Sequence, residues 1–259
     1  MEIFLNIPTN AVGKKLYEAC LETCENHAGE LDLINKWLTD MEQFEILEQD
    51  IKTGQDFTSV KNLYQLQALF IIASTDLSII TSQMYLCKIK LQHLYFNRQA
   101  NLTVYEAHET YSTHKQFLRS IVSARYPELE PIFNEINAEE KVFVRKFKIK
   151  TTVMDVRNKV GGHIHKNFKE WYETVNNLDG EQDARMTIAF IELFTRIFRL
   201  TTTLTSLEHQ RFIEYEQKSK ASIENSLQKI QDLMDKENEK LPSGHKLDFD
   251  LQQIRDLLK

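Results

Sequence analysis

Interruptions to helical structure are scarce in this chain, which has only 7 glycines and 4 prolines in 259 residues. These two residue types most often end or break a helix. Apolar residues recur at helical spacing along most of the sequence, and the composition is 42% hydrophobic and 27% charged, as in a folded, helix-rich protein. We therefore expect an all-α fold, an elongated helical bundle that buries a sizeable core.

The apolar periodicity also predicts where the individual helices lie. Gly29 is expected to separate the first two, Pro127 follows the end of another, and Asn137 with Glu140 resembles a capping box at a helix start. The expected helices cover residues 9–26, 31–52, 59–91, 100–125, 137–154, 181–210 and 250–258.

The helices group into three regions. Residues 1–58 are expected to form an N-terminal helical segment that packs on a bundle over residues 59–215, and residues 216–259 a C-terminal helical extension. Apolar residues in the extension step by four, three and four, which is too short a seam to predict a coiled coil: Ile223, Leu227, Ile230 and Met234. The extension is expected either to pack on the bundle or to mediate association.

The most apolar stretch, residues 66–86, is interrupted repeatedly by polar residues, so we interpret it as a buried core helix rather than a membrane span. The N-terminus lacks the pattern of a signal peptide. Three cysteines without paired spacing, Cys20, Cys24 and Cys87, indicate reduced thiols. These features predict a cytoplasmic protein that does not associate with a membrane.

Motifs for common cofactors are missing from the sequence. No Glu-x-x-His occurs, and the few glycines leave no P-loop, dinucleotide fingerprint or nucleophile elbow. His108 and His114 are six residues apart, not four as in zinc-protease helices, so a solvated or capping role is expected for each of them and for Glu109. We expect no metal and no cofactor.

Basic residues are concentrated between Lys141 and Lys169. This segment has nine lysines and arginines against Asp155 alone, whereas the net charge of the whole chain is −6. Such asymmetry favours a surface that faces a polyanion such as RNA, although most charge runs are simply solvated faces.

A short motif lies in this basic segment: Arg157-Asn158-Lys159-Val160-Gly161-Gly162-His163. It resembles the signature of HEPN domains, in which an arginine, usually followed by Asn, Asp or His, precedes a histidine by four to six residues. The abortive-infection type runs Arg-(Asn/Asp)-Lys-Val-x-Ala-His, and this chain has Gly162 at the alanine position. HEPN domains are all-α bundles. Many are metal-independent endoribonucleases of defence or toxin systems, whose protomers pair so that both motifs line one cleft. The resemblance therefore implies a homodimer.

The motif residues suit metal-free RNA cleavage. Arg157 would stabilise charge on the phosphate, His163 would be the general acid or base, and Asn158 would support both. In a continuous helix Arg157 and His163 would point about 240° apart, so a break at the two glycines is needed for both to face one phosphate. Flanking residues are expected to bind substrate: Lys159, Lys166 and His165, the last being a possible second proton shuttle or, less favourably, a metal ligand.

Acidic residues are candidates for orienting Arg157. Asp76 lies inside an apolar helical stretch, where a hydrogen-bonded structural role is somewhat favoured over a role at the motif. Glu109 shares a helix face with Glu106, and the two form a second candidate pair.

A second hypothesis assigns no catalysis to the motif. The chain would then be a helical module that binds RNA or a protein partner, in the latter case through its C-terminal helices. Arg157 would pair with Asp155 or an interior acid, and His163 would point elsewhere. The two hypotheses differ in whether Arg157 is locked in an internal ion pair or faces an open, positive cleft.

Overall fold

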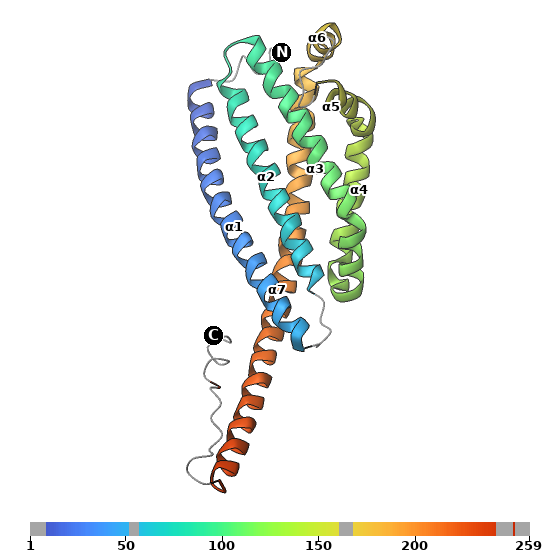
Figure 1. Cartoon of the computed structure of the whole chain (residues 1–259). Helices are drawn as coiled ribbons and strands as arrows, with labels where there is room; N and C mark the ends of the chain where they lie inside the picture. The colour runs from blue at the N-terminus through green and yellow to red at the C-terminus, as the bar shows by residue number, and fades with distance from the viewer. Residues whose placement is uncertain (1–8, 52–56, 161–167, 242–250, 252–259) are drawn as a thin grey trace. The chain divides into compact units, whose positions relative to one another are not determined.

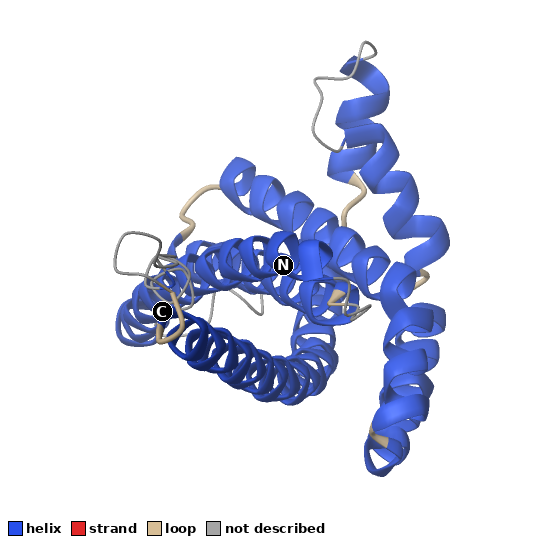
Figure 2. Cartoon of the chain, turned by 60° about the horizontal axis from the view of Figure 1, so that its bottom comes forward, coloured by secondary structure: helices blue, strands red, loops and turns tan. Residues whose placement is uncertain are grey.

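The computed structural model describes residues 9–51, 57–160, 168–241 and 251. The described residues are almost entirely helical, and none of them forms a strand (Figure 2). The all-α expectation is confirmed. The chain divides into two packing units, Met1–Thr205 and Ser206–Lys259. The boundaries between the three helical regions, expected after residues 58 and 215, stay predictions.

The first helix, α1, is one uninterrupted element over Thr9–Ile51 that packs against α2, Thr58–Leu86 (Figure 1). The expected break at Gly29 is wrong. A glycine inside a helix costs roughly 1 kcal/mol relative to alanine. The buried Ile34 and Met41 beyond it, and the 2.7 Å hydrogen bond between His27 Nδ1 and Thr75 Oγ1 before it, hold both halves of α1 in place.

The boundary between α2 and α3 also differs from the expectation. The chain was expected to remain helical to Leu91, but α2 ends at Leu86 and α3 covers Lys90–Arg125. Cys87 and Ile89 adopt extended backbone angles, and the Gln92 side chain accepts a hydrogen bond from the Lys88 backbone N–H at the new helix start. This short break lets α3 return along α2. The end of α3 before Pro127 is confirmed.

Helix α2 is long and apolar enough to cross a membrane. It is the only helix among the described residues with that length and composition. Several of its side chains are nevertheless fully enclosed by the protein, including Leu63, Leu66 and Phe70. The cytoplasmic location stays a prediction.

The segment before the motif is more irregular than its periodicity indicates. A 3-10 turn, η1 (Pro127–Leu129), leads into α4 (Glu130–Lys146), so Asn137 lies inside a helix and does not cap one. Lys148 then adopts a left-handed conformation with φ 52°, and a π-helical turn, η2 (Ile149–Val153), follows. The expected helix over 137–154 is wrong because burial of Ile149 and Val153 favours a redirected chain over a straight continuation.

The motif arginine lies on the short helix α5, Met154–Val160. The two glycines that follow, where a break was expected, lie outside the described residues. Helix α6, Phe168–Asn176, was not expected from the sequence. Helix α7, Gly180–Asn238, is far longer than the expected 181–210. The Asp179 carboxylate caps its start by accepting hydrogen bonds from the backbone N–H groups of Glu181 and Gln182.

Aromatic side chains form much of the core of the first unit. The ring centroids of Phe70 on α2 and Phe194 on α7 are 5.2 Å apart, and those of Phe143 on α4 and Phe190 on α7 are 5.5 Å apart. These contacts place the N-terminal part of α7 beside both α2 and α4.

The second unit contains the rest of α7. Leu227 is buried there, whereas Ile230, from the same expected seam, is 45% exposed. The helix expected over residues 250–258 lies outside the described residues apart from Leu251.

Candidate functional site

Apolar packing of α5 determines which of its side chains reach the surface. Val156 is buried together with Val175 of α6, and Leu94 and Trp171 pack against this pair. Arg157 and Asn158 follow Val156 directly and are exposed. Burial of Val156 therefore leaves the first two motif residues, Arg157 and Asn158, at the surface of α5.

Arg157 is held by side chains on α3 and by its own neighbour. Its Nε donates to Oε1 of Glu106 at 2.9 Å, and its Nη1 donates to Oδ1 of Asn158 at 3.3 Å. The guanidinium carbon lies 5.9 Å from the centre of the Tyr105 ring. The hydrogen bond and charge of Glu106 raise the pKa of Arg157, so the guanidinium stays charged. The side chain is 47% exposed, so the pair is at the surface and not internal.

The other basic residue of the motif helix has a separate partner. Lys159 Nζ lies 2.7 Å from Oδ2 of Asp155, and this hydrogen bond raises the pKa of Lys159. Lys159 therefore does not join the Arg157 contacts. His163, His165 and Lys166 lie outside the described residues.

Of the acids considered from the sequence, Glu106 contacts Arg157, whereas Asp76 and Glu109 do not. Asp76 is at the surface of α2, where partial burial raises its pKa, and no described residue forms an ion pair with it. Glu109 lies next to His108, 3.4 Å from its Nδ1. Glu106, one turn before Glu109, holds the arginine. Sequence spacing had identified the right face of the helix but gave no reason to prefer Glu106, because the contact spans 51 residues.

The basic segment retains free positive charge beyond the motif. Lys141, Arg145, Lys148 and Lys150 are exposed on α4 and the following turn, and the described residues offer none of them a salt-bridge partner. Their charges are therefore available to an anionic ligand, whereas those of Arg157 and Lys159 are shared with carboxylates.

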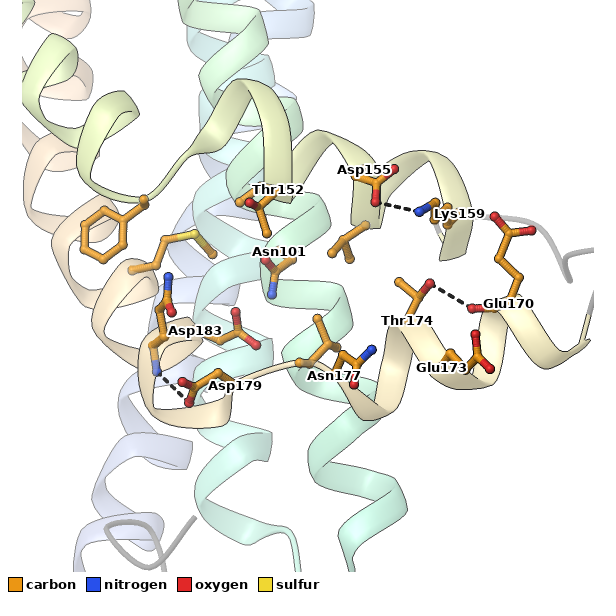
Figure 3. A pocket seen from close by; sticks show the side chains of 16 residues that line it. Asn101, Thr152, Asp155, Lys159, Glu170, Glu173, Thr174, Asn177, Asp179 and Asp183 are labelled. Carbon is orange, nitrogen blue, oxygen red and sulfur yellow. Dashed lines mark hydrogen bonds and ion pairs between the residues drawn. The ribbon is translucent and has the colours of Figure 1, made fainter.

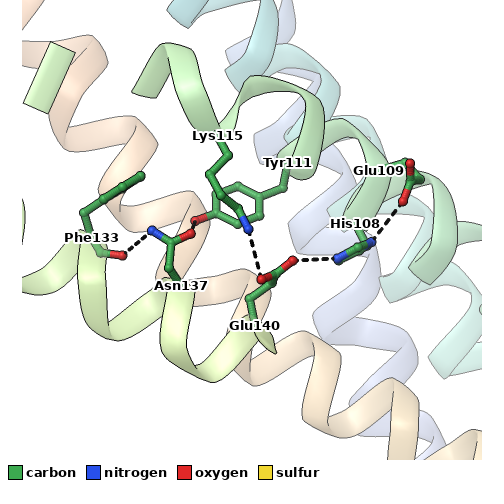
Figure 4. A network of polar contacts seen from close by, with 7 residues as sticks. All are labelled: His108, Glu109, Tyr111, Lys115, Phe133, Asn137 and Glu140. Carbon is green, nitrogen blue, oxygen red and sulfur yellow. Dashed lines mark hydrogen bonds and ion pairs between the residues drawn. The ribbon is translucent and has the colours of Figure 1, made fainter. Parts of the chain in front are cut away.

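A buried polar network links α3 to α4 away from these charges (Figure 4). Glu140 accepts hydrogen bonds from His108 Nε2 and Lys115 Nζ, each at 2.9 Å. Burial would raise the pKa of Glu140, but the hydrogen bonds and charges of His108 and Lys115 lower it to about 2. Tyr111 donates to Asn137 beside them.

This network corrects two sequence interpretations. His108 is 1% exposed and therefore not solvated, and Glu140 pairs with it across helices instead of capping its own. The partners are 32 residues apart, so no local spacing could reveal them. His114 is half-buried and bonds the Thr110 carbonyl one turn earlier.

Comparisons with protein-family models, with curated proteins and with solved structures gave no match. Within the described part of the chain, no three His, Cys, Asp or Glu side chains are grouped as a metal site. The residues of the site are therefore the evidence for its chemistry.

Proposed function

We propose that the chain is a metal-independent endoribonuclease of the defence or toxin kind, acting as a homodimer. The observation that supports this proposal most is the state of Arg157: a surface guanidinium oriented by Glu106, Asn158 and Tyr105. An arginine fixed in this way still has N–H groups free to bind a phosphate oxygen. It loses less conformational entropy on binding than a freely moving arginine would.

The proposed reaction needs three actions. The 2′-hydroxyl loses a proton, the negative charge that develops on the phosphate is stabilised, and the leaving oxygen gains a proton. Arg157 supplies the fixed positive charge, and Asn158 maintains its orientation through the 3.3 Å hydrogen bond. His163 is proposed for proton transfer because imidazole titrates near neutral pH. The resemblance to HEPN domains supports this division of roles.

Four basic residues that have no salt-bridge partner among the described residues support a nucleic-acid substrate. Lys141, Arg145, Lys148 and Lys150 would contact phosphates that flank the cleaved one, together with Lys166 and, after leaving Asp155, Lys159. Phosphate contacts of this kind position a nucleic acid without reading its sequence. Binding is therefore expected to weaken steeply as the salt concentration rises.

The test is to incubate the purified protein in EDTA with total RNA and with defined single strands. We expect the wild type to leave 2′,3′-cyclic phosphate ends, and Arg157→Ala and His163→Ala to be inactive yet folded by circular dichroism. Arg199→Ala and His93→Ala are the matched controls, because both lie elsewhere in the first unit and should cleave normally. Absence of wild-type cleavage, or equal cleavage by all variants, would exclude the proposal.

A second candidate function is a non-catalytic module that binds RNA or a protein partner. The Arg157–Glu106 pair favours it, because a carboxylate already occupies one edge of the guanidinium. If this second function is correct, we expect RNA to bind without being cut, and we expect binding to be lost when Lys148 and Lys150 are changed to Glu. A filter-binding assay beside the cleavage assay separates the two functions.

A further inference from the structure

A cavity of about 360 Å³ in the first unit is lined by α3, η2, α5, α6 and the start of α7. Its charged lining residues are five acids and one base: Asp155, Glu170, Glu173, Asp179, Asp183 and Lys159 (Figure 3). Arg157 and Asn158 are not lining residues, although Lys159, proposed above to contact a flanking phosphate, is one. Its charge is opposite to that of the basic segment.

Asp183 is the most enclosed of these acids. The residue is 9% exposed, and its Oδ2 atom is buried without a hydrogen-bond partner among the described residues. Burial raises its pKa to about 6, even though a hydrogen bond from Asn101 acts in the opposite direction. A buried carboxylate oxygen without a donor is rare in folded proteins, because its lost hydration is not replaced. Asp183 lines the cavity, and rotation of its carboxylate would turn this covered oxygen toward a donor bound there.

Several of the other acids are already fixed by the protein. Asp155 pairs with Lys159, and Asp179 caps α7. Glu173 forms a weaker pair with Lys169, in which the two charged groups are 3.9 Å apart and largely exposed. Figure 3 shows Glu170 and Glu173 on α6, across the cavity from Asp183 on α7. A ligand would therefore meet carboxylates at two separated places.

The cavity is also lined by apolar side chains, among them Phe147, Leu178 and Met186. The volume lies in the range of small-molecule sites, which combine apolar walls with a few directed polar groups. Because no three described acids converge as a metal site, the negative charge suits a ligand whose positive charges are also spread apart.

We propose that this cavity binds a linear aliphatic amine with two or more ammonium groups. One ammonium group donates to the carboxylate of Asp183, the methylene chain lies along Leu178 and Met186, and a second ammonium group reaches Glu173 and Glu170. The proposal does not depend on ribonuclease activity, since none of these residues belongs to the proposed catalytic set.

Isothermal titration calorimetry of the full chain with spermidine, at constant ionic strength, tests the proposal. We expect saturable binding, and loss of at least tenfold in affinity for Asp183→Asn. Glu192→Gln removes the same charge from an exposed position of α7 outside the cavity, and we expect its affinity to stay within twofold of wild type. Magnesium chloride at equal charge concentration is expected to displace spermidine poorly.

Three results would overturn the proposal: no saturable binding, equal affinity of Asp183→Asn and wild type, or displacement by magnesium as effective as by a diamine. If Asp183→Asn loses its helical circular dichroism signal, Glu173→Gln replaces it as the decisive variant. A loss of about threefold or more is then expected from removing one of the separated charges, and no loss would overturn the proposal.

Discussion

Glu140 and Asp183 are both buried carboxylic acids of the first unit, 5% and 9% exposed, but their pKa values move in opposite directions. Glu140 receives hydrogen bonds from His108 and Lys115, and its pKa falls to about 2. One oxygen of Asp183 has no hydrogen-bond partner in the described part of the chain, and the pKa of Asp183 rises to about 6. Burial raises the pKa of both acids, and the partners of Glu140 reverse the direction of its shift.

The difference separates a structural polar group from a candidate binding group. Both oxygens of Glu140 have hydrogen-bond partners, His108 and Lys115, which joins α3 to α4 and leaves nothing for a ligand. Asp183 faces a cavity with a hydrogen-bonding position unused. The pair therefore teaches that an unmet hydrogen bond, and not burial itself, is the signal of a site.

The largest expected effect comes from Glu140→Gln. Removing one partner of a buried ion pair leaves the charge of Lys115 uncompensated, which should lower the free energy of unfolding by about 3–5 kcal/mol. Urea unfolding at pH 7 measures this, with Glu192→Gln as the control expected to change it by less than about 0.5 kcal/mol.

The acid limb of the stability profile provides a second check on Glu140→Gln. Because the folded-state pKa of Glu140 is lowered, its contribution is present above its usual pKa of 4.5 and is lost as the pH falls toward 2. The wild type should lose up to about 3 kcal/mol over this window beyond what the variant loses. If the stabilities of the wild type and of Glu140→Gln fall in parallel with pH, the ion pair between Glu140 and Lys115 would be contradicted.

Asp183→Asn is expected to act in the opposite direction. Because the folded-state pKa of Asp183 is raised, its contribution is present below its usual value of 3.8 and is lost as the pH rises through about 6. In the absence of amine, the variant should be more stable than the wild type at pH 8, by up to about 3 kcal/mol, and the difference should shrink toward pH 4.

Thermal melting between pH 4 and pH 8 measures the difference for Asp183→Asn. Other charged groups face the cavity from α5, α6 and the start of α7, and they remain in both proteins: Asp155, Lys159, Glu170, Glu173 and Asp179. Their titration therefore largely cancels in the comparison. Lower stability of the variant throughout would show that Asp183 is satisfied like Glu140.

The smallest stability effect is expected for Glu106→Gln. The Arg157–Glu106 pair is 47% and 56% exposed, so its loss should change the free energy of unfolding by less than about 1 kcal/mol. If Glu106 orients Arg157 for catalysis, kcat should nevertheless fall while KM changes little. Glu109→Gln, three residues along the same helix, is the matched control, and equal kcat values for both variants would remove Glu106 from that role.

The sequence predicted most where local rules decide the structure. Sparse glycine and proline indicated an all-α chain, and Pro127 correctly marked the end of α3. Local rules failed at Gly29 and at residues 87–89, because tertiary packing holds α1 together and turns the chain between α2 and α3. Propensity differences of about 1 kcal/mol are easily exceeded by such packing.

The candidate sites show the same division. The motif of Arg157 and Asn158 and the concentration of basic residues are properties of the sequence, since they lie within one short segment. The contact of Arg157 with Glu106, the contact of His108 with Glu140 and the place of Asp183 in a cavity became identifiable only when helices far apart in the chain were packed together. Sequence periodicity determines which face of a helix is apolar. Which buried polar atom meets a partner, and which does not, depends on distances that only the tertiary structure sets.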